Sequence, residues 1–467
     1  MAKRSGTMKR ALLIGIGIII LAVAVGWGYL TYRQWTSYRT PIPKEAGSVI
    51  QISVDRLVWQ LIRDNGWKTP SLSSRADTAL SLTPGRMGIE TPANLFVYTL
   101  PEFPADHYFG VVQVNDSVAL FRALQPGTDK PGIRQNGITF FRMGRFTLGY
   151  HAGRAAFAFS AKGNKADTVQ LSARLHQLLS GENMIPVSQS DFYPLRQQRT
   201  HVAWLGKLGR LGLDFEKGLI RLSGKLSVTP PADRSLVRPD FSAGNALSLW
   251  LNTGLEQVLA GQTYRIETHT LHGDSLLGYY RGGLALEWRG STTQRDTTIT
   301  YGYNDDFELE EQVTVVENTI PELVAAVNTD HVGLHGYLIR QGIITPGAPQ
   351  LNRSVFPLYE VNIRPLGDTA LHLYTGSTPL DSPPPGHASD VFYLRMNFRQ
   401  LTDQQAVAIP AVYTAALNEL EVFGRLTDTA AGRTGELLIS GMLRMVADQG
   451  PSANSLTQLI GAMQAMP

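Results

Sequence analysis

Residues 11–30 form an uncharged apolar run, ALLIGIGIIILAVAVGWGYL, which constrains the chain more than any other sequence feature. At about 1.5 Å of rise per residue, a helix of this length crosses a hydrocarbon core of roughly 30 Å. Four basic residues precede the run: Lys3, Arg4, Lys9 and Arg10. Because positive charge stays on the cytoplasmic side, residues 1–10 are predicted to be a cytoplasmic tail and residues 11–30 a transmembrane helix.

Aromatic side chains cluster at the end of the run and just after it: Trp27, Tyr29, Tyr32 and Trp35. Such a cluster is typical of the membrane–water interface, so the bulk of the chain is predicted to lie outside the cytoplasm. A signal peptide cleaved at Ala24 is the alternative, because Ala22-Val23-Ala24 matches the small-x-small cleavage pattern. Against cleavage, the apolar run continues through Val25 and Leu30, where a signal peptide turns polar.

The basic tail accounts for the positive charge of the whole chain. The formal net charge is +3, and the four basic residues of the tail supply +4, which leaves −1 for the remainder. A near-neutral ectodomain lacks the positive surface of a nucleic-acid-binding protein. We therefore expect the membrane and an envelope protein as partners, and no nucleic acid.

The 467-residue chain contains no cysteine. This excludes disulfides, thiolate metal sites, cysteine nucleophiles and lipid attachment at an N-terminal cysteine. Eukaryotic ectodomains of this size usually carry disulfides, so an exported chain without cysteine favours a bacterial envelope. The predicted location is the bacterial inner membrane, with the N-terminus in the cytoplasm and the bulk in the periplasm.

One local pattern occurs four times in the ectodomain: alternating apolar residues, then Asp or Asn, then an amphipathic stripe with helical spacing. The four copies end at Asp55, Asn115, Asn252 and Asn397. A period of two indicates a half-buried strand, and an Asx side chain can accept hydrogen bonds from the first N–H groups of a helix. The copies therefore predict strand-to-helix units with these residues as helix caps.

Two copies are followed by further strands and a second helix, which predicts two related halves. The strands at residues 155–160 and 436–446 hold equivalent places before these second helices. Runs of strands without regular βαβ alternation favour an α+β fold with mainly antiparallel sheets. A proline-rich stretch at residues 230–239 separates the halves, so the domains are predicted to be residues 41–237 and 238–467.

Between residues 263 and 317, short alternating segments predict a meander of short strands. These segments surround Arg265, Ala285, Ile299 and Thr314. The following segment, residues 320–340, is predicted to be helical.

Three short stretches of the ectodomain carry a family resemblance. They are the opening with Pro43, Ala46, Val49, Ile52 and Val54, the strand entry Phe215-Glu216-Lys217-Gly218, and the helix start Asn454-Ser455-Leu456. In these stretches the chain resembles uncharacterised, lipoprotein-like envelope proteins of Bacteroidota. The resemblance implies an envelope location, but no known chemistry and no functional residues. The chain departs from that pattern, because it has a membrane helix and no cysteine for lipid attachment.

The densest group of potential metal ligands is ETHTLHGD, residues 267–274. Within it, His269, His272 and Asp274 could share a zinc or similar ion. On an extended strand the two histidines face opposite sides, so they could converge only across a turn at Gly273. A polar strand face with a hairpin is the alternative interpretation, and no cofactor is predicted.

Two further clusters lack part of a known site pattern. His331 and His335 stand at i and i+4, but Val332 replaces the glutamate of the zinc protease signature. The acidic run at residues 305–311 lacks the glycine spacing of a calcium loop and is interpreted as a solvated turn and a charged strand edge. The sequence has no nucleophile elbow, P-loop or dinucleotide-binding pattern.

The leading hypothesis is a membrane-anchored periplasmic scaffold or partner-binding envelope protein without catalytic activity. Its sheet edges and loops would engage the partner. Two alternatives stay open: an anchored metal-dependent hydrolase that uses the His269 region, and a periplasmic carrier of lipid or another hydrophobic ligand.

Overall fold

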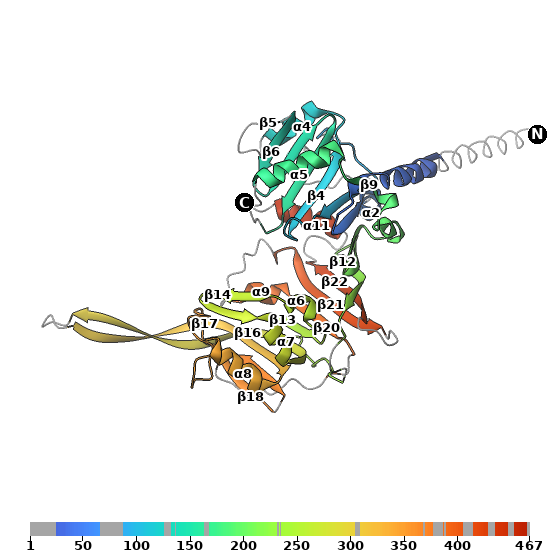
Figure 1. The fold of residues 1–467 in the computed structure, drawn as a ribbon. Helices are drawn as coiled ribbons and strands as arrows, with labels where there is room; N and C mark the ends of the chain where they lie inside the picture. Colours follow the sequence, from blue (N-terminus) through green and yellow to red (C-terminus); the bar gives the residue numbers. More distant parts are fainter. Residues whose placement is uncertain are drawn as a thin grey trace, which may run out of the picture. The chain divides into compact units, whose positions relative to one another are not determined.

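The chain divides into two compact units, Met1–Asp214 and Phe215–Pro467 (Figure 1). The computed structural model describes residues 25–65, 87–125, 132–135, 137–162, 168–230, 233, 235–303, 309–367, 369–376, 386, 389–404, 414–427, 435–446 and 453–464. Both units combine helices with antiparallel sheet, which confirms the predicted α+β class. The predicted boundary after residue 237 falls inside the second unit, because the strand at Leu219–Val228 pairs with the strand at Gly435–Met445.

Most of the predicted transmembrane segment, residues 11–24, lies outside the described residues. Residues 25–37 form a helix, called helix 25–37 below, which includes the last six residues of the predicted span. Among the residues that the structure describes, no helix combines the length and the apolar character needed to cross a membrane.

The main sheet of the first unit has the strand order β11-β10-β2-β3-β4-β8-β7-β6-β5, with antiparallel neighbours. Its strands are β2 (Ser48–Ser53), β3 (Asn94–Thr99), β4 (His107–Gln113), β5 (Ile133–Gln135), β6 (Ile138–Met143), β7 (Phe146–His151), β8 (Arg154–Ser160), β10 (Val202–Gly206) and β11 (Gly209–Glu216). A separate short pair joins β1 (Pro41–Pro43) to β9 (Met184–Pro186). The helices that follow helix 25–37 are α2 (Val54–Asn65), α4 (Ser117–Leu124), α5 (Thr168–Ser180), and the 3₁₀ turns η2 (Val187–Gln189) and η3 (Tyr193–Gln197).

Helices cover both faces of this sheet. Ala155 and Ala156 are consecutive residues of β8, so their side chains point to opposite faces. Ala155 belongs to the same buried cluster as Leu120 of α4, whereas Ala156 belongs to the cluster of Leu175 of α5. The first unit is therefore a three-layer structure with α4 and α5 on opposite sides.

The sheet of the second unit has the order β12-β22-β21-β20-β13-β16-β17-β19-β18, again antiparallel. Its strands are β12 (Leu219–Val228), β13 (Leu247–Leu251), β16 (Tyr280–Tyr303), β17 (Leu309–Thr329), β18 (Asn362–Leu366), β19 (Ala370–Tyr374), β20 (Phe392–Asn397), β21 (Leu417–Thr427) and β22 (Gly435–Met445). A hairpin outside this sheet pairs β14 (Thr263–Ile266) with β15 (His269–His272). The helices are α6 (Glu256–Leu259), α7 (Gly273–Tyr279), α8 (His331–Arg340), α9 (Phe398–Asp403) and α11 (Ser455–Gln464).

The two sheets share one strand order over seven positions. The order β11-β10-β2-β3-β4-β8-β7 in the first unit matches β21-β20-β13-β16-β17-β19-β18 in the second, and the chain visits the strands in the same sequence. An aspartate caps the helix after β4 and the helix after β17. Asp116 Oδ1 accepts from the N–H of Val118 at 2.9 Å, and Asp330 Oδ1 accepts from the N–H of Gly333 at 3.1 Å.

Of the four predicted helix caps, Asn397 is confirmed, because its Oδ1 accepts a hydrogen bond from a backbone N–H of α9 at 3.0 Å. The prediction is wrong by one residue at Asn115, since Asp116 caps α4. It is also wrong at Asp55, which lies inside the first turn of α2, and at Asn252, which is buried and donates to two backbone carbonyls.

The predicted meander is correct at β14 but wrong beyond it. One long antiparallel ribbon, made of the 24-residue β16 and the 21-residue β17, replaces the separate short strands. The predicted helix at residues 320–340 is also wrong in its first half, because β17 continues to Thr329 and α8 begins at His331. This end of β17 is hydrogen-bonded to both β16 and β19, and an apolar run in such a central strand resembles a buried helix.

The distal half of the β16–β17 ribbon extends well beyond the rest of its sheet, as the yellow arm in Figure 1 shows. From Thr297 to Tyr303, β16 pairs only with β17 among the described strands. The Arg295–Glu317 ion pair at 2.9 Å crosses the ribbon near its base. Most of the predicted acidic turn lies outside the described residues, at 304–308.

Candidate functional site

The predicted metal ligands His269, His272 and Asp274 have separate surroundings. His269 Nδ1 lies 2.9 Å from the carbonyl oxygen of Gln341, and its Nε2 lies 3.2 Å from Ser354 Oγ. Asp274 Oδ1 accepts a hydrogen bond from a backbone N–H at 2.9 Å. Both histidines lie on β15, in the hairpin that was the alternative interpretation of this segment.

The other predicted histidine pair, His331 and His335, lies on α8 with the i, i+4 spacing that places two side chains on one helical face. Within the described part of the chain, no three His, Asp or Glu side chains gather closely enough to hold a metal ion. The structure therefore brings together neither the His269 group nor a third ligand for the α8 pair.

A buried polar network joins helix 25–37 to the first sheet. Gln51 of β2 is only 1% exposed; its Oε1 accepts from the Tyr38 hydroxyl at 3.1 Å, and its Nε2 donates to Asn94 Oδ1 at 3.1 Å. Asn94 of β3 donates in turn to Ser37 Oγ at 2.7 Å. Burial raises the pKa of Tyr38 above its ordinary value, so its hydroxyl remains a hydrogen-bond donor at physiological pH. The end of the helix is thus part of the core.

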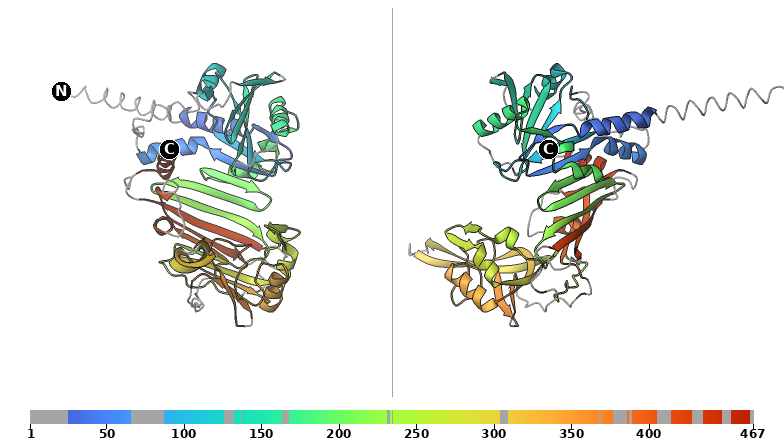
Figure 2. Two further views of the ribbon diagram at one scale, coloured as in Figure 1. Left: turned by 90° about the vertical axis from the view of Figure 1, so that its left-hand side faces the viewer. Right: turned by 45° about the vertical axis from the view of Figure 1, so that its right-hand side comes forward.

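An ion pair fixes the helix one turn earlier. Arg33 Nη1 lies 3.2 Å from Asp55 Oδ1, and Arg33 Nη2 donates to the Thr91 carbonyl at 2.7 Å. Burial raises the pKa of Asp55, although the Arg33 guanidinium acts in the opposite direction. Because Asp55 lies in the first turn of α2, these contacts hold helix 25–37 beside α2 (Figure 2).

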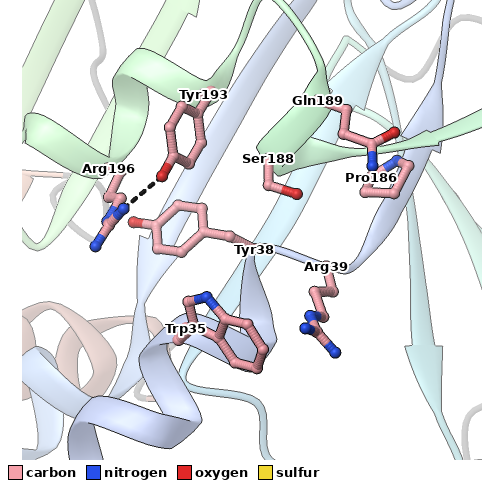
Figure 3. A pocket seen from close by; sticks show the side chains of 8 residues that line it. All are labelled: Trp35, Tyr38, Arg39, Pro186, Ser188, Gln189, Tyr193 and Arg196. Carbon is pink, nitrogen blue, oxygen red and sulfur yellow. Dashed lines mark hydrogen bonds between the residues drawn. The ribbon is translucent and has the colours of Figure 1, made fainter.

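A pocket of about 400 Å³ opens where helix 25–37 ends (Figure 3). The lining residues are Trp35, Tyr38, Arg39, Pro186, Ser188, Gln189, Tyr193 and Arg196. They come from the helix end, from β9 and from the turns η2 and η3. The β1–β9 pairing brings these segments together, and the Ser188 N–H donates to the Tyr38 carbonyl at 2.9 Å.

Aromatic rings and guanidinium groups dominate the pocket. The Arg39 guanidinium lies 3.7 Å from the centroid of the Trp35 ring, a close cation–π contact. Tyr193 meets Tyr38 edge-on, with ring centroids 6.3 Å apart, and Arg196 donates to the Tyr193 hydroxyl (Figure 3). The eight described lining residues include two arginines and no carboxylate, so the pocket is suited to an anion.

The pocket adjoins a larger groove of about 1830 Å³ between helix 25–37 and α2, with which it shares Trp35, Tyr38 and Arg196. The apolar lining of the groove includes four exposed side chains: Trp27, Leu30, Val58 and Trp59. Its charged lining consists of Arg33, Arg56, Arg196, Arg199 and Asp55. Together the pocket and the groove are lined by five arginines, including Arg39, and one aspartate, so their formal net charge is +4.

Sequence reasoning placed Trp35 in an interfacial aromatic belt but did not identify Tyr38, Arg39, Tyr193 or Arg196. The residues of the two walls are separated by at least 147 positions in the chain, from Arg39 to Pro186. Three-residue strands with proline join them, and such strands carry no periodic signal.

No protein-family model and no curated protein matches the chain. Solved structures of TP0453 align with it at low similarity. Crystal form IV shows 10% identity and a TM-score of 0.23, over 51% of this chain and 96% of TP0453. Crystal form I shows 9% identity and a TM-score of 0.21, over 72% of this chain and 93% of TP0453. Crystal form III covers the same shares at 9% identity and a TM-score of 0.22. Scores this low do not establish a common fold.

Proposed function

We propose that this protein is a membrane-tethered, non-catalytic envelope protein that binds a partner at the periplasmic face of the bacterial inner membrane. Residues 1–10 lie in the cytoplasm, residues 11–30 span the membrane, and the rest of the first unit and the whole second unit are periplasmic. The observation that carries the proposal is the way helix 25–37 is built into the core of the first unit.

A flexible tether would let the first unit turn freely relative to the membrane. Here the helix is held at Arg33, Ser37 and Tyr38 by an ion pair and buried hydrogen bonds. A membrane span joined directly to helix 25–37 therefore sets the orientation of the first unit. Such a joint serves a scaffold, because a scaffold must present its binding surfaces in a defined direction.

The exposed aromatic side chains of helix 25–37 support a position at the membrane interface. Trp27 is 74% exposed, Tyr29 60% and Tyr32 61%. Large rings left in water are unfavourable, whereas tryptophan and tyrosine are stable at the level of lipid headgroups. Lipid contact would cover these rings.

Membrane extraction and protease protection test this topology. The full chain with a tag at each end is expected to remain with inner membranes at alkaline pH, whereas a chain lacking residues 1–24 is expected to be released. Protease added to spheroplasts should remove the C-terminal tag and leave the N-terminal tag intact. Release of the full chain at alkaline pH, or loss of the N-terminal tag, would contradict the proposal.

The distal β16–β17 ribbon is the surface that we assign to a protein partner. Val313 is 60% exposed and Val315 58% exposed, and both share one face of the ribbon with Tyr301, which is 62% exposed. Along the distal ribbon the outer edges of β16 and β17 pair with no other described strand, so they can offer backbone groups to an extended peptide segment. Two-stranded ribbons are marginally stable alone, so a partner strand would stabilise the arm.

Photocrosslinking in native membranes tests the ribbon. A photoreactive residue at Val313 or Val315 is expected to give one discrete adduct, because these side chains lie on the apolar face. The matched control is Thr314, which points to the opposite face of the same strand. Equal adducts from both faces, or none from Val313 and Val315, would argue against this surface.

The shared strand order supports the further proposal that the two units are related halves. Seven strands occupy equivalent sheet positions, and capped helices follow β4 and β17. Chance rarely places so many strands in one order with the same connections. Separate superposition of experimental structures of the two units should match these seven strands; a mismatch in strand direction would exclude the relationship.

A further inference from the structure

We propose that the pocket and groove beside helix 25–37 bind one anionic phospholipid, with its phosphate headgroup in the pocket that Arg39 and Arg196 line and its acyl chains along the groove. The inference rests on the proposed membrane tether, and it names the ligand class of the site. The protein would thereby select lipid at the place where its anchor leaves the bilayer.

The arginines provide the first part of the argument. Arg39 is held against Trp35, and Arg196 is held by the Tyr193 hydroxyl, so each guanidinium group is already ordered, one on either side of Tyr38 (Figure 3). Neither forms an ion pair with a described carboxylate. Arginine binds phosphate oxygens through two parallel hydrogen bonds, and its preordering reduces the entropy lost on binding. A phosphate headgroup therefore suits a pocket that two such arginines line.

The size of the pocket agrees with a headgroup. A volume of about 400 Å³ lies in the usual range for small-ligand sites, roughly 300–1,000 Å³. Ser188 and Gln189 at its rim add polar groups that can hydrogen-bond to a glycerol or similar headgroup. The pocket is therefore large enough for a phosphate together with a small polar substituent.

The groove distinguishes a lipid from a free phosphate. Trp27, Val58 and Trp59 line it and are 74%, 49% and 66% exposed, although a soluble phosphate would bury none of this apolar surface. Hydrocarbon chains would cover it, while the groove arginines would stay near the headgroup level. Arg56, whose Nη1 donates to the Gln198 carbonyl at 2.9 Å, is fixed at this level. Arginines near the pocket and apolar walls along the groove match the anionic headgroup and the hydrocarbon chains of an anionic amphiphile.

Calorimetric titration of the full chain in neutral detergent tests the inference. Three probes are compared: dihexanoyl phosphatidylglycerol, dihexanoyl phosphatidylcholine and inorganic phosphate. We expect saturable binding of one phosphatidylglycerol, and affinities at least about tenfold lower for the other two. If inorganic phosphate bound as tightly as phosphatidylglycerol, the pocket would be a site for free phosphate, and the proposed lipid ligand would be wrong. Equal binding of phosphatidylcholine would show simple apolar adsorption and would overturn the anionic site.

Substitutions locate the binding. Arg39→Gln combined with Arg196→Gln is expected to weaken phosphatidylglycerol binding at least about tenfold, because the pocket loses both of its positive charges. Arg122→Gln, at an exposed arginine of α4 in the same unit, should leave it unchanged. Arg196→Lys keeps the charge and should give an intermediate loss, so it replaces the double variant if that variant fails to fold. Unchanged affinity in the folded Arg39 and Arg196 variants would overturn the proposal.

These results are separable from the proposed function. Loss of selective lipid binding with normal membrane extraction would overturn this inference and leave the tether standing. Release of the full chain from membranes would contradict the tether, whereas the titration in detergent would still report whether the pocket prefers an anionic lipid.

Discussion

Replacing Gln51 with leucine is expected to loosen helix 25–37 from the first unit. Gln51 is buried, and its amide bonds to three side chains: the Tyr38 hydroxyl, Ser53 Oγ and Asn94 Oδ1, each at 3.1 Å. Leucine has a similar volume, so the substitution removes hydrogen bonds without opening a large cavity. The effect therefore measures the polar joint itself.

The magnitude follows from the number of bonds. Three hydrogen bonds at about 1 kcal/mol each suggest a loss of about 3 kcal/mol in the free energy of unfolding. The Tyr38 hydroxyl and Asn94 Oδ1 are also left buried without this partner, which adds cost, while burial of the leucine side chain offsets part of it. We expect a net destabilisation of roughly 2–4 kcal/mol. Adding Asn94→Leu should cost less than the sum of the two single changes, because the partners act in one network.

Urea unfolding in neutral detergent, followed by a spin label at Thr36→Cys, reports this joint. The chain has no cysteine of its own, so the label is unique. Gln51→Leu should lower the unfolding midpoint and increase label mobility before unfolding. Gln113→Leu, at an exposed position of β4, is the matched control and should change the free energy by less than about 0.5 kcal/mol. Indistinguishable midpoints and mobilities for the two variants would refute the buried joint.

Three further predictions concern the two units separately. Asp116→Ala should destabilise the first unit by about 1 kcal/mol in denaturant titrations, whereas Asn115→Ala should have little effect, because only Asp116 caps α4. Leu120→Ala, at a fully buried residue, should cost about 2–5 kcal/mol, and Val118→Ala, at a 63% exposed residue, less than about 0.5; equal losses would contradict the packing of α4. Burial lowers the pKa of His372 in the folded chain below its ordinary value of 6.5. As the pH falls below about 6.5, the unfolded chain therefore binds a proton at this residue before the folded chain does, and the second unit loses stability. In melting curves between pH 7 and 5, His372→Gln should abolish this loss of stability. A variant whose melting temperature falls with pH as steeply as that of the unchanged chain would contradict the prediction.

A helix follows each of the four predicted strands because the signals for these junctions are local, but only one of the four predicted caps is confirmed. The alternation before Asn397 lies within a few residues of the helix that this side chain caps. The error at Asn115 has a local cause as well. Two adjacent Asx residues can both cap a helix. The N–H groups of Asn115 and Asp116 are both bonded to the Gly88 carbonyl, at 2.8 Å and 3.1 Å, and the extended Asp116, which directly precedes α4, directs its carboxylate at the helix.

The long strands could not be predicted from local pattern. In β17, Ile320 and Val324 are both buried, at a spacing that also fits a helix. The strand forms because β16 and β19 pair with it on both sides, and β19 lies more than 40 residues further along the chain. Pro321 is tolerated because it lies before the start of the β19 pairing at Val324, where one side of β17 needs no N–H donor.

The candidate pocket could not be predicted from local pattern either, because its two walls come from segments that are distant in the chain. Its two walls meet where β1 and β9 pair over three residues, and the N–H groups of Val187 and Ser188 extend this contact by donating to the carbonyls of Thr40 and Tyr38. Side chains beneath it also stabilise the contact: Ile42 and Val187 are completely buried in the core cluster that contains Tyr38. The same core therefore fixes the end of the helix and the wall of the pocket. A ligand at Arg39 and Arg196 would bind across both, so its occupancy should raise the stability of the joint that Gln51→Leu weakens.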